Sequence, residues 1–366
     1  MSQDDNTQLF PFQKLPADCQ VYIFSHLNSI EKAKIATVCK SWNDLLRTPR
    51  LWNCVDFHIL TSCDCTIYIG IGNRRPVNTC EKCKSLSHYV DFKQRCYRYI
   101  AHLAERRAVI KSLKFQFDLH EDKNVWLKLL VYALNMTTVN ELSIVDCNWT
   151  VTGEKPSSLY VTDDFMEKKK EQRVEALQGF LLVLNKHSPN INTLRLEFDW
   201  SETSLELLSS FKEIKCLELY RFWVYKSIPQ ERINFLLNNA KKLESLKLEI
   251  WVPYQHEELH PQFSLMSSTL QYLDVSSSKG FFIRSLNMPQ LKTLIIVRLP
   301  WIGPLLPVSM LDITCVYDVL REGAPKLEQI NQHKLCSDWK NLCYPELESQ
   351  LNHTCYCTKH KKGWAL

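Results

Sequence analysis

The apolar residues between positions 10 and 57 fall into short clusters with helical spacing, which predicts three short helices. Asn28 and Glu31 have the spacing of a capping box and predict where the second helix begins. Thr48 followed by Pro49 predicts a further helical start, because proline suits the first position of a helix. A segment of about 45 residues is near the lower size limit for independent folding. We therefore expect its apolar surface to be covered by the rest of the chain or by another protein.

A different pattern recurs from residue 110 onward: an apolar residue, two others, a second apolar residue, one other, and a third apolar residue. The central apolar residues of its copies are Leu113, Leu142, Leu194, Leu217, Leu246, Leu273, Leu294 and, more weakly, Leu311. The steps between these centres are 29, 52, 23, 29, 27, 21 and 17 residues. Such periods fit repeat units that each supply one short strand and a return segment.

The return segments differ along the chain. Helical spacing of apolar residues occurs at 125–134, 174–184 and 233–237. After residue 250 the returns are shorter and richer in proline, so we expect extended or single-turn segments there. Residues 338–349 are predicted to form a capping helix over the open end of the core.

The N-terminal segment strongly resembles the F-box. The family pattern is matched without insertion at Leu15, Pro16, Ile23, Phe24, Leu27, Val38, Cys39, Lys40, Trp42, Leu51, Trp52 and Phe57. The resemblance implies that this segment binds a Skp-type adaptor and, through it, a cullin-RING ubiquitin ligase. By the same resemblance, the adaptor-binding residues are Leu15, Pro16, Ile23, Phe24, Leu27, Val38, Trp42, Leu51 and Trp52.

Residues from about 110 to 331 resemble leucine-rich repeats. That family often places asparagine or cysteine three residues after the last apolar strand residue. Only Cys147 fits, whereas Asp199 is a polar substitute and Phe222 is apolar. This departure puts regular curvature in doubt, and another α/β arrangement is the alternative.

Together these features predict an α/β protein that begins with a small all-α F-box of three helices at residues 9–57. A linker and first helix with a cysteine-rich segment follow at 58–108. An irregular leucine-rich-repeat solenoid with parallel strands and helical or extended returns occupies 109–335. A C-terminal cap and tail complete the chain at 336–366.

The composition fits a folded protein that needs neither a membrane nor nucleic acid. Of its 366 residues, 45% are hydrophobic and 23% are charged, and the formal charge of +5 is spread along the chain. The first ten residues lack the basic and apolar runs of a signal peptide. Many of the fifteen cysteines lie in apolar patterns, where a thiol acts as a small hydrophobe. We expect a reducing location, cytoplasmic, nuclear or both.

Two groups of residues have metal-ligand spacing. Cys63, Cys65, Cys80 and Cys83 could close a structural zinc site, or they could be four reduced thiols in a strand and a loop. His256 to His260 match the zinc-protease pattern H-E-x-x-H, but prolines bracket the motif, so a surface loop is favoured over a zinc hydrolase. The sequence shows no other pattern typical of a cofactor site or of a set of catalytic residues. We therefore expect a protein that is not an enzyme.

Partner-binding residues are expected on the repeats. Alternate strand residues point away from the core, and large aromatics recur near or beyond the strand ends. The candidates for substrate binding are Tyr220, Trp223, Trp251 and Tyr254. The alternative is that these aromatics buttress loops against the core of the solenoid.

The main hypothesis is a substrate-recognition subunit of an SCF-type ubiquitin ligase. The F-box would bind the Skp-type adaptor, and the repeats would bind a protein substrate. The alternative is an F-box scaffold protein that binds the adaptor without delivering substrates for ubiquitination.

Overall fold

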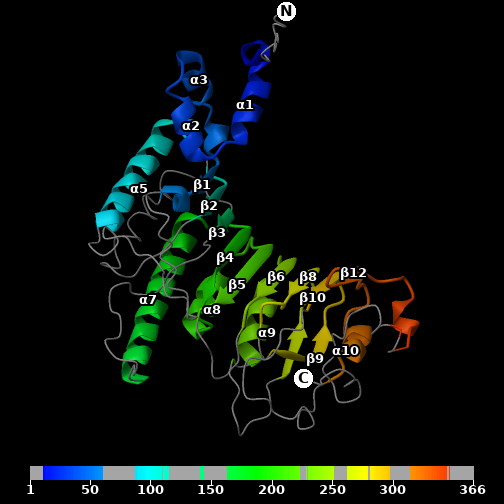
Figure 1. The fold of residues 1–366 in the computed structure, drawn as a ribbon. Coiled ribbons are helices and arrows are strands. Elements are labelled where there is room, and N and C mark those ends of the chain that lie inside the picture. Colours follow the sequence, from blue (N-terminus) through cyan, green and yellow to red (C-terminus); the bar gives the residue numbers. More distant parts are fainter. Residues whose placement is uncertain are drawn as a thin grey trace, which may run out of the picture. The chain divides into compact units, whose positions relative to one another are not determined.

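The computed structural model describes residues 11–60, 87–108, 110–114, 141–143, 163–222, 228, 230–250, 262–278, 281–296, 314–343 and 346. The chain divides into two compact units, which are described separately (Figure 1). Unit 1 comprises residues 1–116 and 128–139, and unit 2 comprises residues 117–127 and 140–366.

Unit 1 begins with the helical segments that the sequence predicts. The elements are η1 (Phe12–Lys14), α1 (Ala17–Ser25), α2 (Ser29–Ile35), α3 (Lys40–Leu45), η2 (Pro49–Trp52) and η3 (Phe57–Leu60). The predicted capping box is confirmed: Asn28 Oδ1 accepts from the Glu31 amide at 2.9 Å, and Glu31 Oε2 accepts from the Asn28 amide at 2.8 Å. Pro49 stands at the start of η2 after Thr48, as predicted, although this element is a 3-10 turn.

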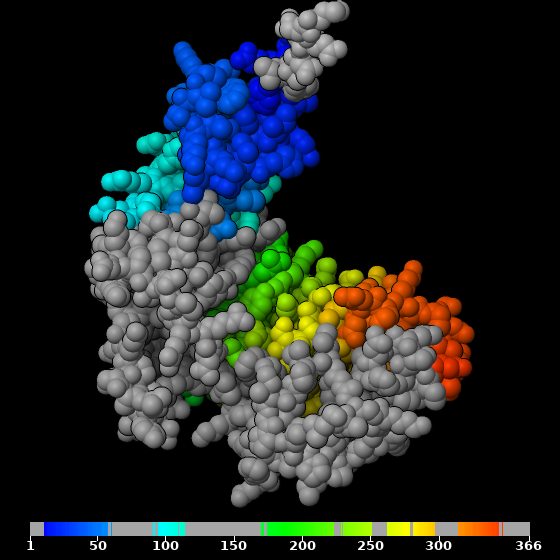
Figure 2. Space-filling model, in the orientation of Figure 1, coloured from blue at the N-terminus to red at the C-terminus, as the bar shows by residue number. Residues whose placement is uncertain are grey.

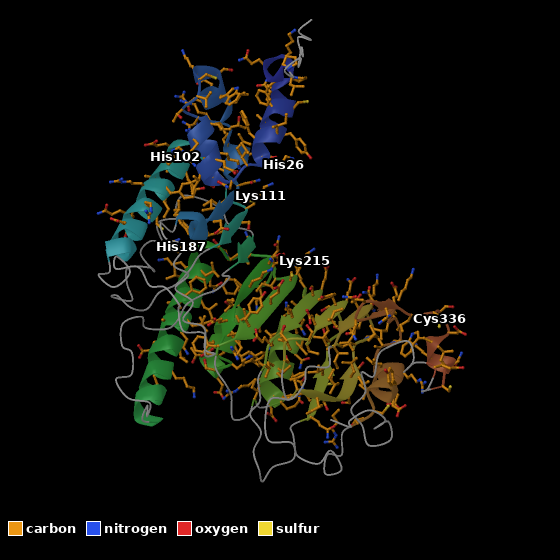
Figure 3. The ribbon with its side chains drawn as sticks, in the orientation of Figure 1. His26, His102, Lys111, His187, Lys215 and Cys336 are labelled. Carbon is orange, nitrogen blue, oxygen red and sulfur yellow. The ribbon has the colours of Figure 1, made fainter. Side chains whose placement is uncertain are left out.

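Helix α5 (Ser87–Glu105) covers part of the apolar surface left by these short helices. Its Cys96, Ile100 and Leu103 are buried, and the ring of its His102, labelled in Figure 3, packs edge-on against Trp52 with the centroids 5.0 Å apart. Trp52 is 1% exposed. The expectation that the rest of the chain covers apolar surface of the N-terminal segment is confirmed at this helix.

The described residues of unit 1 also include the strands β1 (Cys54–Asp56) and β2 (Ser112–Lys114), which pair in parallel. Val55 lies opposite Leu113, and both are buried. Trp52, Val55 and Phe57 have the same apolar spacing as the copies after residue 110. The repeated pattern therefore begins inside the N-terminal segment, which the sequence analysis missed.

Unit 2 contains a sheet whose strand order follows the sequence, β3-β4-β5-β6-β8-β10-β11-β12. Its strands are β3 (Glu141–Ser143), β4 (Thr193–Phe198), β5 (Cys216–Arg221), β6 (Ser245–Leu248), β8 (Tyr272–Asp274), β10 (Thr293–Ile295), β11 (Gln329–Ile330) and β12 (His333–Lys334). Neighbours pair in parallel except β11 with β12. In the space-filling view the described residues of unit 2 run from green through yellow to orange in chain order (Figure 2).

The register aligns the central leucines of the repeated pattern. Leu142, Leu194, Leu217, Leu246, Leu273 and Leu294 lie opposite one another on successive strands. The strand positions predicted from these leucines are thus confirmed. In β4 buried residues alternate with half-exposed ones, so one face of the sheet belongs to the core and the other faces outward.

Helices supply several of the connections (Figure 1). They are α7 (Asp163–His187), α8 (Glu202–Ser209), α9 (Gln230–Asn239) and α10 (Val316–Gly323). The helical spacing at 174–184 and 233–237 is confirmed, since Leu177, Leu181 and Leu236 are buried in α7 and α9. The sequence analysis did not predict α8. The helix expected at 125–134 and the eighth copy around Leu311 lie outside the described residues.

After residue 250 two returns are extended, as predicted. β7 (Gln262–Met266) and β9 (Phe282–Asn287) pair in parallel as a separate two-stranded sheet. In the predicted capping segment, the structure shows the 3-10 turn η5 (Trp339–Asn341) and a helical Glu346. Residues 344, 345 and 347–349 lie outside the described residues, so the predicted helix is not tested over its length. Among the helices of the described residues, none is long and apolar enough to cross a membrane.

The turns before the strands of unit 2 share one hydrogen-bond arrangement. The carbonyl of the residue preceding one strand accepts two amide hydrogens at the start of the next strand. The accepting carbonyl is given first and the two donating amides second: Asn192 with Lys215 and Cys216, Lys215 with Glu244 and Ser245, Glu244 with Gln271 and Tyr272, Gln271 with Lys292 and Thr293, and Lys292 with Glu328 and Gln329. The N···O distances are 2.8 to 3.0 Å. In unit 1, Asn53 binds Lys111 and Ser112 in the same way.

Candidate functional site

Three aromatic rings hold the first elements of unit 1 together. Phe12 of η1, Phe24 of α1 and Trp42 of α3 have ring centroids 5.2 to 5.6 Å apart in each pairing. Phe24 is 4% exposed, whereas Phe12 and Trp42 are half-buried. Aromatic pairs at such separations stabilise a fold beyond their buried area. The cluster therefore fixes how α1 and α3 present their outer sides.

A second core forms around Trp52. Its Nε1 donates to the Leu46 carbonyl at 2.7 Å. The buried Lys32 ammonium donates to the Leu51 carbonyl at 2.7 Å and lies 5.9 Å from the Trp52 ring centroid. Burial lowers the pKa of Lys32. The Arg106 guanidinium lies 5.1 Å from the same ring centroid, so Trp52 is an interior residue covered by cationic groups.

Several large apolar side chains of these helices remain exposed. Tyr22 is 67% exposed, Ile23 42%, Ile30 38% and Val38 63%. They come from α1, α2 and the segment just before α3. Exposed apolar groups concentrated on a small domain mark a surface for a protein partner.

Comparison with protein families matches residues 12–58 to the F-box-like family. These residues form an F-box-like domain. The predicted F-box is thereby confirmed, while the match does not include the repeat region. A comparison with curated protein sequences found no match. An F-box-like domain implies binding of a Skp-type adaptor and association with a ubiquitin ligase, and F-box proteins are generally non-catalytic subunits.

The nine predicted adaptor-binding residues of the F-box-like domain fall into three groups by burial. Pro16, Ile23 and Val38 are exposed; Leu15, Leu27 and Trp42 are half-buried; Phe24, Leu51 and Trp52 are buried. Sequence reasoning missed Tyr22 and Ile30 as exposed apolar residues. Helical spacing alone could not show which side of such short helices faces outward.

Tyr220 is the one candidate substrate-binding residue that lies within the described residues. Its hydroxyl donates to Glu218 Oε2, and the Lys247 ammonium lies 5.7 Å from its ring centroid. Burial, together with the hydrogen bond to Glu218, raises the pKa of Tyr220. Tyr220 is thus a half-buried aromatic on the outward face of the sheet of unit 2.

A row of charged residues crosses the sheet at Glu218, two residues before Tyr220 on β5. Arg195, Glu218, Lys247 and Asp274 lie opposite one another on successive strands. Arg195 Nε lies 2.7 Å from Glu218 Oε1, and Lys247 Nζ lies 3.9 Å from Asp274 Oδ2. This row therefore carries charges of both signs on the outward face of the sheet.

Several candidates cannot be placed. Trp223, Trp251 and Tyr254 lie outside the described residues, as do the four cysteines of the possible zinc site, Cys63 to Cys83, and His256 to His260. In the part of the chain that the structure describes, no group of three histidine, cysteine or acidic residues could hold a metal ion.

Proposed function

We propose that this protein is a substrate-recognition subunit of an SCF-type ubiquitin ligase. The observation that supports the proposal best is the set of exposed apolar residues on the F-box-like domain. The side chains of Ile23 and Val38 are 42% and 63% exposed, whereas isoleucine and valine are usually buried in a folded protein. A Skp-type adaptor that covered them would remove this apolar surface from water.

Burial assigns different roles to the nine adaptor-binding candidates in this proposal. Pro16, Ile23 and Val38 touch the adaptor directly because their side chains are accessible. Leu51 and Trp52, at 2% and 1% exposure, act through the core by holding the helices in place. The half-buried residues contribute to both.

Unit 2 holds the protein substrate in this proposal. Its parallel strands in sequence order and its repeated turn hydrogen bonds support a leucine-rich-repeat-like solenoid. Tyr220, with Trp223, Trp251 and Tyr254, would contact the substrate. The subunit works by proximity, since holding an acceptor lysine near a ubiquitin-loaded enzyme raises its effective concentration.

Co-purification with a Skp-type adaptor tests the proposal. We expect the wild-type chain to form a stoichiometric complex and Val38→Glu to lose it while keeping its circular-dichroism spectrum. Gln94→Glu adds the same charge at an exposed position of α5 and serves as the matched control. A folded wild-type chain that does not co-purify with the adaptor would overturn the proposal. A chain that binds the adaptor but leaves every bound protein unmodified in a reconstituted ligase would instead favour the scaffold alternative.

A further inference from the structure

The turns that precede the strands of unit 2 form a continuous edge, which we call the turn edge. It comprises residues 212–215, 241–244, 268–271, 289–292 and 325–328. The repeated carbonyl hydrogen bonds hold its segments side by side from Lys215 to Glu328. Each segment contains one buried apolar residue, such as Leu243, so its charged side chains are directed outward.

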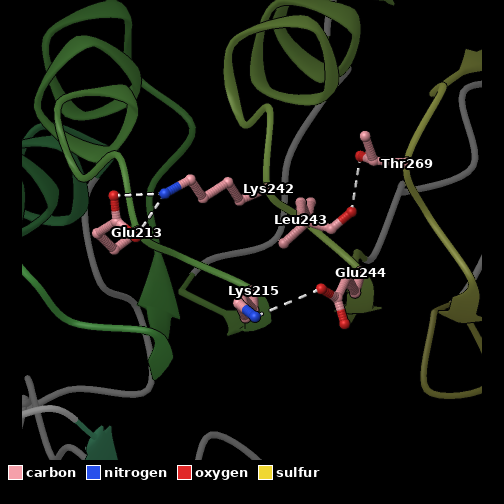
Figure 4. A network of polar contacts seen from close by, with 6 residues as sticks. All are labelled: Glu213, Lys215, Lys242, Leu243, Glu244 and Thr269. Atoms are coloured by element: carbon pink, nitrogen blue, oxygen red, sulfur yellow. Dashed lines mark hydrogen bonds and ion pairs between the residues drawn. The ribbon is translucent and has the colours of Figure 1, made fainter.

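The turn edge carries an excess of positive charge. Its charged residues are Lys212, Lys215, Lys241, Lys242, Lys292 and Lys326 against Glu213, Glu244 and Glu328. Two lysines pair across neighbouring segments: Lys242 Nζ lies 2.6 Å from Glu213 Oε1, and Lys215 Nζ lies 3.7 Å from Glu244 Oε1 (Figure 4). Lys241 and Lys292 are exposed and make no ion pair within the described residues.

The outward face of the sheet differs from the turn edge in charge. By strand alternation, Arg195 and Lys247 stand there with Glu197, Glu218, Glu249 and Asp274. Ion pairs join Arg195 to Glu218 at 2.7 Å and Arg221 to Glu249 at 3.9 Å. The face therefore has two cations for four anions, whereas the turn edge has six cations for three anions. An anionic partner gains electrostatic energy from the edge.

We propose that the turn edge binds an acidic polypeptide segment. Adjacent strands lie about 4.8 Å apart, so the four steps from β5 to β11 span about 19 Å. An extended chain rises about 3.3 Å per residue. A segment of about six residues therefore reaches all five turns. We infer that this acidic segment belongs to a protein substrate, which rests on the proposed function. Binding of the segment to the turn edge does not itself require the adaptor.

Fluorescence anisotropy of the full-length chain with a labelled six-glutamate peptide tests this inference. We expect binding that weakens as salt rises, and no binding of a six-glutamine peptide. Replacing one lysine by glutamate removes one attraction to a glutamate of the peptide and adds one repulsion. At about 0.5 kcal/mol for each exposed pair, Lys241→Glu and Lys292→Glu should each weaken binding about fivefold. Arg284→Glu, an exposed reversal on β9, is the matched control and should leave binding unchanged.

Three outcomes would overturn the proposal. The first is that the glutamine peptide binds as tightly as the glutamate peptide. The second is that Arg284→Glu weakens binding of the glutamate peptide as much as Lys241→Glu or Lys292→Glu does. The third is that a single-stranded oligonucleotide binds more tightly than the acidic peptide at the same salt concentration. Thermal melting of each variant confirms that unit 2 is folded. Adaptor co-purification from the same samples separates this result from the proposed function, because the reversals lie outside the F-box-like domain.

Discussion

The side-chain amide of Gln230 in α9 pairs with both backbone groups of Ser264 in β7. Gln230 Nε2 donates to the Ser264 carbonyl at 2.7 Å, and Gln230 Oε1 accepts from the Ser264 amide at 2.6 Å. A glutamine side chain thus takes the place of a neighbouring strand at this position of β7. It satisfies backbone groups that would otherwise be left without partners beside a helix.

Gln230→Ala should destabilise unit 2. It leaves a half-buried amide and carbonyl of Ser264 without partners, at a cost of about 1–3 kcal/mol. Chemical denaturation measures the change, and faster hydrogen exchange of the Ser264 amide locates it. Asn238→Ala, at an exposed position of the same helix, is the control. Equal stability of the two variants would contradict a structural role for the Gln230 amide.

Asp199 is predicted to make stability depend on pH. The residue is 8% exposed, and burial raises its pKa above the ordinary value of 3.8, while the nearby Ser201 and Ser204 hydroxyls offset this only in part. The folded state therefore holds the proton more tightly than the unfolded state. Stability from this group is present in acid and is lost as the pH rises through the folded-state pKa.

Asp199→Asn should consequently stabilise unit 2 at pH 7, by about 1 kcal/mol, the scale of relieving one poorly solvated polar group. The advantage should shrink as the pH falls toward 4. Denaturation midpoints at several pH values measure it. Glu206→Gln, at an exposed position of α8, should leave the pH profile of stability unchanged. A gain for Asp199→Asn that is the same at pH 4 and pH 7 would refute the electrostatic explanation.

Gly323 ends α10 where the helix meets β9. A Cβ added there would lie 1.9 Å from the Leu286 carbonyl oxygen, and the neighbouring Met288 amide donates to the Gly323 carbonyl at 2.8 Å. Backbone must therefore move to admit even one methyl group. We expect Gly323→Ala to lower the free energy of unfolding by about 1–3 kcal/mol. Thermal melting beside Glu322→Ala checks this, and unchanged melting would show that α10 shifts freely.

Sequence periodicity predicted the strands of unit 2 because each strand repeats the same three apolar positions. Leu217 and Leu246 are examples whose neighbours in register are also leucines. The same reasoning predicted extended returns after residue 250 but gave no bounds for β9, whose buried residues alternate irregularly. It missed α8 because eight residues give barely two turns of periodicity.

The start of the repeated pattern was missed for another reason. Trp52 and Phe57 belong to the F-box motif and Val55 lies between them, so the same residues serve two patterns. The pairing of β1 with β2 shows that these residues also follow the strand pattern. Exposure was equally hidden from sequence, since Ile23 and Phe24 are adjacent and both apolar, yet only Ile23 faces solvent.

The difference between surface and core residues of the F-box-like domain predicts two kinds of adaptor-binding defect. Trp52→Ala removes a buried ring and its hydrogen bond to Leu46, at a cost of about 3–5 kcal/mol. It should abolish adaptor binding together with helical circular dichroism and protease resistance of unit 1. Ile23→Glu should abolish binding alone. Loss of structure in both variants would place Ile23 in the core as well.

The contacts of Trp52 and Val55 also predict where an independently folding fragment ends. A fragment that stops at residue 58 keeps the F-box-like match but loses α5 and β2, which cover Trp52 and pair with β1. The Trp52 ring and the backbone groups of β1 would then face water. We expect this fragment to be poorly folded without the adaptor, whereas a fragment ending at residue 116 should melt cooperatively. Calorimetry of both fragments, with and without adaptor, measures this. Equal melting temperatures for the two free fragments would show that the short helices of the F-box-like domain are stable without α5 and β2.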